Sequence, residues 1–258
     1  MSREIVSQLK FKKHKGKFDP NSFAKMIEDA YMATKREDKF TQKTSFAPSL
    51  LGYGHGNCPR YWYLAFSGVI FEEQIDSMAL ANMMNGTQAH ERLQKLIRSL
   101  DTFKEEEREM VNVSPPVRGF ADTILEIDGS EVIGEIKTAK EEVFLHRQSS
   151  MSPSANHLLQ LLTYMKINNS KEGFFLYENK NTQEIIVIPV EMNAKNKKII
   201  EDLFDWMSEV WEAFQNKSLP TKAFTKSTYT CKGCPVKSSC YDMEKGDITI
   251  EKYEAPKL

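Results

Sequence analysis

The sequence RGFADTILEIDGSEVIGEIKT, residues 118–138, predicts a β-hairpin at the centre of the fold. Residues 118–127 and 131–138 are rich in β-branched and aliphatic side chains, as strands are. Between them, Asp128-Gly129 is a preferred dipeptide of two-residue hairpin turns. The register of this hairpin therefore decides which side chains of the two strands lie opposite each other.

Two acidic residues of this hairpin are expected to converge. Side chains alternate along a strand, so Glu135 and Lys137 share one face while Ile136 points to the core. Asp122, on the partner strand, lies within reach of Glu135. Converging carboxylates repel each other unless a cation lies between them, and Mg²⁺ or Mn²⁺ prefers such oxygen ligands. Such an ion activates water and polarises a phosphate, whose developing charge Lys137 can stabilise. A surface hairpin with an ordinary Glu–Lys pair is the alternative.

Helices and further strands flank the hairpin. Apolar spacing predicts helices over residues 23–34, 60–66, 78–100, 154–168 and 194–214. Strands are expected over residues 103–113, 173–177 and 185–190. This order predicts an α/β fold with a mixed central sheet flanked by helices.

Three polar residues on these helices are candidates for the same site. An imidazole at His90, one turn after Gly86, would complete a metal site and favour Mn²⁺ somewhat over Mg²⁺. A core histidine with satisfied hydrogen bonds is the alternative. Gln160 and Tyr164 share a helical face with His157, placed to contact the reacting phosphate or the DNA backbone. That face can equally be a solvated one.

The four cysteines indicate a metal site. Cys231, Cys234 and Cys240 lie close together, and Cys58 lies far upstream. Stable disulfides are rare in a cytosolic protein, so a Cys-x2-Cys pair points to metal or redox chemistry. Four thiolates suit zinc or an iron–sulfur cluster. The one-plus-three layout favours [4Fe–4S] over zinc, and four unrelated cysteines are the remaining alternative.

The composition is that of an ordinary globular protein, with 40% hydrophobic and 28% charged residues in 258. No secretory signal or long apolar run is present, so we expect a cytoplasmic protein without a membrane span. A net charge of −1 argues against a generally basic surface but not against a basic groove. The lysines at 10, 12, 13, 15 and 17 form either such a contact or a solvated terminus.

Taken in order, these motifs resemble RecB-type nucleases of the PD-(D/E)XK superfamily, in particular the iron–sulfur members. Those members include CRISPR-adaptation nucleases, AddB-type nuclease domains and related phage exonucleases. The motifs that carry the resemblance span residues 58–240 and are Cys58-Pro-Arg60, Gly86-x3-His90, Gly119-Phe-Ala-Asp122, Glu135-Ile-Lys137, Gln160-x3-Tyr164 and the cysteine triplet. Ala121 replaces the proline of the family name, which casts little doubt on the metal site.

The resemblance implies a restriction-endonuclease-like core and a set of roles. The metal ligands would be His90, Asp122, Glu135 and the Ile136 carbonyl. Lys137 would be the catalytic lysine, with Gln160 and Tyr164 as the "QxxxY" motif. The four cysteines would hold [4Fe–4S], with zinc as the alternative, in a helical lobe joining the two ends of the chain. The predicted segments are a lead segment (1–45), a helical part (46–100), the nuclease core (101–216) and the iron–sulfur segment with its tail (217–258).

The predicted activity is metal-dependent cleavage of DNA, as an exonuclease on single strands or ends in recombination, repair or phage replication. The sequence has no Gly-x4-Gly-Lys-Ser/Thr loop, so unwinding would need a helicase or other partner. Arg60 is a candidate for phosphate contact and Tyr63 for base stacking, with core packing the alternative for Tyr63.

Other functions stay open. A non-catalytic DNA-end-binding module held together by zinc or iron–sulfur is the main one, although the complete Asp122, Glu135 and Lys137 set argues against it. An RNA nuclease also fits the motifs. A cysteine-based redox enzyme lacks the strand–Cys-x2-Cys–helix context. Cleavage polarity, strand preference, exonuclease against endonuclease action and oligomeric state are not fixed by the sequence.

Overall fold

The computed structural model describes residues 18–34, 42–72, 75–243 and 245–257. The lysines at 10, 12, 13, 15 and 17 lie outside the described residues. In chain order, the elements are α2 (Pro20–Ala33), η1 (Pro48–Leu50), η2 (Gly54–Asn57), α3 (Pro59–Phe66), α4 (Ser77–Ile97), β1 (Phe103–Asn112), β2 (Val117–Ile127), β3 (Ser130–Ala139), α5 (Glu141–Ser150), α6 (Ala155–Ile167), β4 (Glu172–Asn179), β5 (Ile185–Glu191), α7 (Ala194–Gln215), α8 (Tyr229–Lys232) and α9 (Lys237–Asp242).

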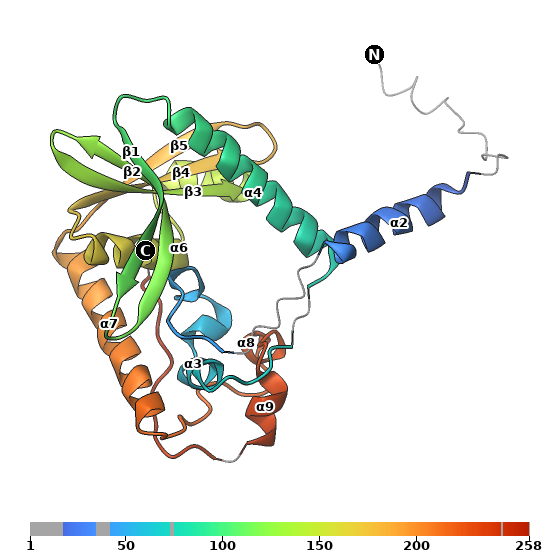
Figure 1. The fold of residues 1–258 in the computed structure, drawn as a ribbon, viewed down its shortest axis with the longest axis vertical. Coiled ribbons are helices and arrows are strands. Elements are labelled where there is room, and N and C mark those ends of the chain that lie inside the picture. Colours follow the sequence, from blue (N-terminus) through green and yellow to red (C-terminus); the bar gives the residue numbers. More distant parts are fainter. Residues whose placement is uncertain (1–17, 35–41, 73–74, 244, 258) are drawn as a thin grey trace. The chain divides into compact units, whose positions relative to one another are not determined.

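The five strands form one mixed sheet in the order β1-β2-β3-β4-β5 (Figure 1). All neighbours are antiparallel except β3 and β4, which run parallel. A parallel pair needs a crossover connection, and α5 and α6 supply it. The predicted α/β fold with a mixed sheet is confirmed.

The sheet is covered on both faces, and strand alternation decides which side chains meet which helix. Ile136 and Leu176 pack with Leu93 and Ile97 of α4. Their neighbours on the strands point the other way, and Phe175 lies in the larger core with residues of α6 and α7. Figure 1 shows α4 and α6 on opposite sides of the strands. The charged residues of β3 therefore lie inside a layered structure and not on an open hairpin.

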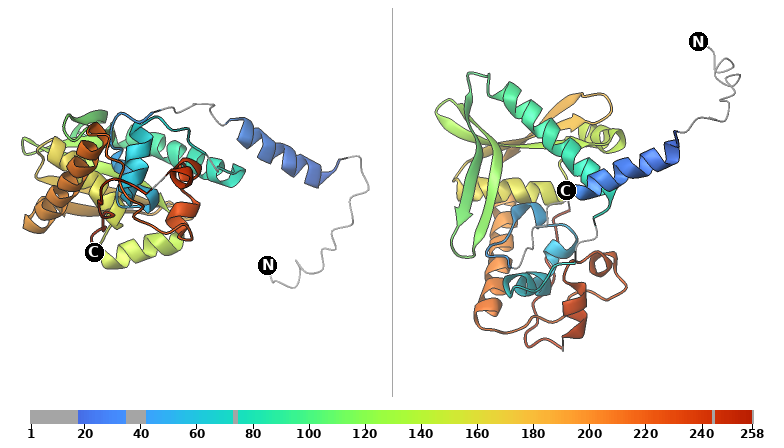
Figure 2. Two further views of the ribbon diagram at one scale, coloured as in Figure 1. Left: turned by 90° about the horizontal axis from the view of Figure 1, so that it is seen from below. Right: turned by 45° about the vertical axis from the view of Figure 1, so that its right-hand side comes forward.

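The segments before and after the sheet pack together in a second part of the core. Helix α3 is buried along nearly its whole length and packs against α7. Trp206 of α7 donates through Nε1 to the Glu251 carbonyl at 2.8 Å. Helices α3 and α9 contact each other and lie side by side in Figures 1 and 2. Residues from before and after the sheet thus share one lobe.

Helix α2, with the lead-in and first part of α4 up to Met83, forms a separate compact unit. It begins three residues before the predicted residue 23 because Asp19 accepts from the Asn21 N–H and Pro20 occupies the first helical position. Its apolar residues Phe23, Met26 and Ile27 are exposed.

Helix α5 was not predicted, and neither were the short helices η1, η2, α8 and α9. Helix α5 buries only Phe144 and therefore lacks the apolar stripe that marks a helix in a sequence. Its first turn carries Glu141 and Glu142, whose charges favour a helix N-terminus. Among the described helices, none combines the length and apolar character that crossing a membrane requires.

Candidate active site

The site forms where β2 and β3 stop pairing. Their register runs from Ile127 opposite Ser130 to Thr123 opposite Gly134. One residue further along, the Asp122 carboxylate takes over as acceptor: its Oδ2 accepts the Ile136 N–H at 2.7 Å. This bond fixes Asp122, which is 9% exposed, against the segment that carries Glu135 and Lys137.

Glu135 and Lys137 form a tight ion pair in this site. Lys137 Nζ lies 2.5 Å from Glu135 Oε2 and 3.9 Å from Asp122 Oδ2. The Glu135 carboxylate is completely buried, and its other oxygen, Oε1, has no hydrogen-bond partner among the described residues. One buried acceptor of the pair therefore remains to be satisfied.

The burial of this pair shifts both pKa values. Burial raises the pKa of Glu135 to about 8, against the opposing effect of Lys137, and the Asp122 charge adds to the rise. For Lys137, burial opposes the charged form, but Glu135 and Asp122 outweigh it and hold its pKa above the ordinary value. We take the ammonium as charged, because two carboxylates face it.

Helix α4 contributes two side chains, four residues apart on one face. His90 Nδ1 lies 3.7 Å from Asp122 Oδ1, and the imidazole is 28% exposed. Gln94 Nε2 donates to the Asp122 carbonyl at 2.9 Å and to Glu107 Oε1 at 2.7 Å. The histidine thus lies beside the carboxylates, and the glutamine ties the helix to β2.

Glu107 is a third carboxylate at the site, one that sequence reasoning did not identify. Its charge adds to the rise in the pKa of Glu135. Its backbone has φ +50°, a left-handed conformation that costs about 1 kcal/mol or more outside glycine. In the sequence it is one of three consecutive glutamates, 105–107, and nothing in that run distinguishes it.

Tyr164 and Gln160 of α6 are buried under the sheet, so the solvated-face alternative is excluded for them. Burial first, then the Glu135 charge, raises the pKa of Tyr164, and the polar contacts with Gln160 and the Phe120 backbone oppose this rise. A Cβ on Gly119 would lie only 2.5 Å from that hydroxyl oxygen. Glycine at 119 is therefore what lets Tyr164 reach β2.

His157, on the same helix, lies beside the lysine end of the site. Its Nδ1 lies 2.8 Å from the Tyr177 hydroxyl, and Tyr177 is opposite Lys137 in the β3–β4 register. Burial lowers the pKa of His157 to about 3, and the charges of Lys137 and Arg147 add to this. The imidazole is therefore neutral near pH 7.

The four cysteines gather around one small cavity of about 30 Å³. All four are free and partly buried. Burial raises the pKa of Cys58 to about 12 and that of Cys234 to about 11, and neighbouring cysteines add to both shifts. No residue of the Asp122–Lys137 hairpin lines this cavity. The cysteine cavity and the carboxylate site are separate groupings.

Neither grouping is arranged as a ready metal centre. Among the described residues, no group of three or more His, Cys, Asp or Glu side chains is positioned to hold a metal ion. In the carboxylate site, the Lys137 ammonium pairs with Glu135 where a cation would otherwise bind. One Asp122 oxygen also accepts the Ile136 N–H.

The structure corrects the prediction for Arg60. Its side chain is fully buried, and Nη1 donates to the Pro220 carbonyl at 2.7 Å, so it does not face a phosphate. The reason is that the helix after Cys58 is a core helix with almost every residue buried. Tyr63 is partly buried, with its ring 5.9 Å from that of Phe214, as in the core-packing alternative.

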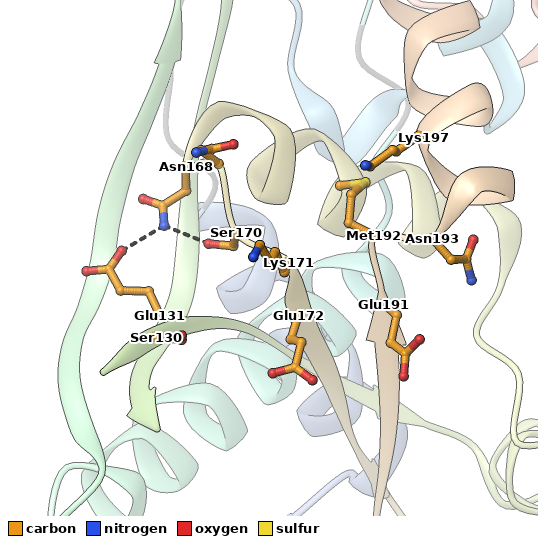
Figure 3. A pocket seen from close by; sticks show the side chains of 11 residues that line it. Ser130, Glu131, Asn168, Ser170, Lys171, Glu172, Glu191, Met192, Asn193 and Lys197 are labelled. Atoms are coloured by element: carbon orange, nitrogen blue, oxygen red, sulfur yellow. Dashed lines mark hydrogen bonds between the residues drawn. The ribbon is translucent and has the colours of Figure 1, made fainter. Parts of the chain in front are cut away.

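Two larger cavities flank β3. One, of about 520 Å³, is lined by Ala89 and Thr138, the sequence neighbours of His90 and Lys137, together with the Arg92–Glu178 ion pair. The other, of about 710 Å³, lies at the opposite end of β3. Figure 3 shows that Asn168 of the larger cavity bonds both Glu131 and Ser170. Neither cavity is lined by Asp122, Glu135 or Lys137.

Comparison with known proteins gives the following. The family model of the PD-(D/E)XK nuclease superfamily matches residues 89–241. The structure of LHK-Exo, an alkaline exonuclease from Laribacter hongkongensis, is similar at 12% identity and TM-score 0.50, covering 73% of this chain and 95% of that one. LHK-Exo in complex with dAMP is similar at 14% identity and TM-score 0.50, covering 67% and 89%. The protein SSO0001 is 18% identical, with TM-score 0.44, over 85% and 94%. No curated protein matches the sequence.

Proposed function

Because this chain belongs to the PD-(D/E)XK nuclease superfamily, we propose that it is a metal-dependent deoxyribonuclease with Asp122, Glu135 and Lys137 at its catalytic centre. The observation that carries the proposal is the buried, unpartnered Glu135 Oε1 beside the Asp122 carboxylate. A buried acceptor of this kind is costly unless a cation or proton meets it.

The donor set suits a hard divalent ion. Asp122 and Glu135 supply carboxylate oxygens, the Ile136 carbonyl lies between Glu135 and Lys137 in the sequence, and His90 Nδ1 lies 3.7 Å from Asp122. These four groups would hold Mg²⁺ or Mn²⁺. When bound, the ion supplies Lewis-acid polarisation of the phosphate and a more acidic water.

The remaining work falls to side chains of the chain itself. The Lys137 ammonium, held charged by its carboxylate neighbours, stabilises negative charge that develops on the phosphate. Tyr164 and Gln160 are buried, and the Tyr164 hydroxyl packs against β2 at Gly119, so these two residues position the strand that carries Asp122.

We propose exonuclease action on single strands or ends of DNA. LHK-Exo is an alkaline exonuclease and has been crystallised with dAMP, a mononucleotide such as an exonuclease releases. Opening of a duplex is assigned to a separate helicase or other recombination or replication partner.

We further propose that Cys58, Cys231, Cys234 and Cys240 hold a [4Fe–4S] cluster with a structural role. Four thiols around one cavity are a donor set that suits either a cluster or zinc. The cavity is small enough for a single zinc ion, whereas the one-plus-three spacing favours the cluster. Visible absorbance and metal analysis of purified protein distinguish the two.

The testing experiment is hydrolysis of end-labelled single- and double-stranded DNA, and of RNA of the same sequence, with Mg²⁺, Mn²⁺ or EDTA. Wild-type protein should cleave DNA only with a divalent ion. Asp122→Ala should abolish cleavage, while Glu126→Gln, an exposed carboxylate change on the same strand, should not. A chain that binds DNA ends yet cleaves nothing with either ion would instead be a non-catalytic end-binding module.

A further inference from the structure

An exposed aromatic ring lies on the strand that leads to Asp122. Alternation along the first part of β2 places Arg118 and Phe120 on one face of the strand, four and two residues before Asp122. The residues between them face inward: Ala121 is fully buried and Gly119 meets Tyr164. The Phe120 side chain is 45% exposed.

The backbone under this ring is held firmly. The buried Tyr164 hydroxyl packs closely against β2 at Gly119, directly before Phe120, so the ring projects from a supported point of the sheet. The Arg118 guanidinium lies 5.8 Å from the ring centroid. Arg118 Nε also lies 2.5 Å from Glu109 Oε1, and Glu109 is opposite Phe120 in the β1–β2 register. The ring and the guanidinium thus lie next to each other on the strand that leads to Asp122.

The charges around this surface favour a base over a backbone phosphate. Glu109 is opposite Phe120 in the register, and the charge of Glu107, two residues away on the same strand, acts on Glu135 in the site. Carboxylates repel phosphates, whereas the face of a base is attracted to aromatic rings and to arginine. On the side away from Asp122, the exposed Val111 continues the apolar surface.

The exposed ring also limits which DNA can bind to it. Inside a duplex both faces of a base are covered by its stacked neighbours, so the ring can stack only on a base that is unpaired or at an end.

We propose that Phe120, together with Arg118, is a stacking platform for a base of an unpaired substrate strand next to the scissile phosphate, and that it makes the site selective for single strands. This inference rests on the proposed nuclease function. It assigns to Phe120 a substrate-binding role, while the chemistry stays with the Asp122–Lys137 hairpin.

The test is steady-state hydrolysis of a single-stranded oligonucleotide series in which one abasic position is moved along the strand. Phe120→Ala should raise KM about tenfold with kcat little changed, within the 1–3 kcal/mol typical of one base stacked on an aromatic ring. Phe120→Trp should restore KM, and Phe120→Leu, which keeps apolar volume, should not. One abasic position should raise the wild-type KM similarly but add nothing in Phe120→Ala.

Controls separate this inference from the function beneath it. Ile185→Ala changes a half-exposed apolar residue on the other edge strand and should leave KM unchanged. If wild-type protein cleaves but Phe120→Ala keeps the parent KM and abasic profile, the platform is overturned and the nuclease stands. The same holds if Phe120→Ala alters only oligomeric state. If the wild type neither cleaves nor binds any strand, the nuclease function itself is overturned, and the platform with it.

Discussion

The carboxylate site and the cysteine cavity both bury titratable side chains, but they handle charge in different ways. In the first, Lys137 lies 2.5 Å from Glu135, so charge is compensated from within the protein. In the second, burial raises the pKa of Cys58 to about 12, and neighbouring thiols add to the rise. The first therefore keeps a charged group ready for a reaction. In the second, burial keeps Cys58 and Cys234 neutral until a thiophilic cation binds, as suits a structural role.

The strongest test of this contrast is to remove the ammonium. Lys137→Met should lower the cleavage rate about 10²-fold or more, because an electrostatic contact to the reacting phosphate is lost. The melting temperature should change little, since Glu135, with its pKa already raised to about 8, can take up a proton. Rates and melting curves are measured together.

Lys171→Met, an exposed lysine change outside the site, is the matched control and should leave both quantities unchanged. A Lys137→Met protein that cleaves at the parent rate would remove this lysine from the catalytic centre.

The second test addresses the cysteines. Cys234→Ser should lower the melting temperature by roughly 10 °C, because losing a bound metal group costs several kcal/mol and each kcal/mol corresponds to about 2–4 °C in a chain of this size. Activity per folded molecule should be retained. Differential scanning calorimetry and metal analysis provide the readouts.

Wild-type protein treated with a chelator should then melt where Cys234→Ser melts, since both lack the metal. If the variant instead keeps its metal and its stability but loses cleavage, the cysteine cavity is catalytic and the contrast between the two regions fails.

The smallest expected effect concerns Glu131, at the far end of the strand that carries Lys137. A hydrogen bond from Arg108, then one from Asn168, lowers the pKa of Glu131 from 4.5 to about 2. A carboxyl group whose pKa is lower in the folded than in the unfolded chain stabilises the fold at pH values above its unfolded pKa. The contribution of Glu131 is therefore present above about pH 4.5 and is lost as the pH falls towards 2.

Glu131→Gln should therefore melt a few degrees below wild type at pH 7, for an ion pair worth about 1 kcal/mol, and the difference should vanish near pH 2. Cleavage at neutral pH should be unchanged. A stability difference that does not vary with pH would show that the ion pair contributes nothing measurable.

Local patterns predicted much of the fold. Alternation and the Asp-Gly turn gave the hairpin to within about one residue at each strand end, and apolar spacing gave α4, α6 and α7. The same alternation places Lys137 beside Glu135, as the structure has them. These features depend only on residues near one another in the chain.

The predictions that failed concern contacts between residues that are far apart in the sequence. Glu107 reaches the site because its strand, β1, pairs with β2 and because Gln94 of α4 bonds to it, and no local pattern encodes either contact. The error at Arg60 has the same origin, because its burial depends on Pro220. That the four cysteines share a cavity agrees with their predicted grouping, whereas the bound metal stays a prediction.

The buried Arg60–Pro220 hydrogen bond also orders the events of folding. It joins residues 160 positions apart, so the buried Arg60 of α3 cannot make this hydrogen bond until residue 220 has left the ribosome. By then, all five strands of the sheet have been synthesised. During synthesis, the sheet with its carboxylates can form first, and the lobe that gathers the cysteines closes last.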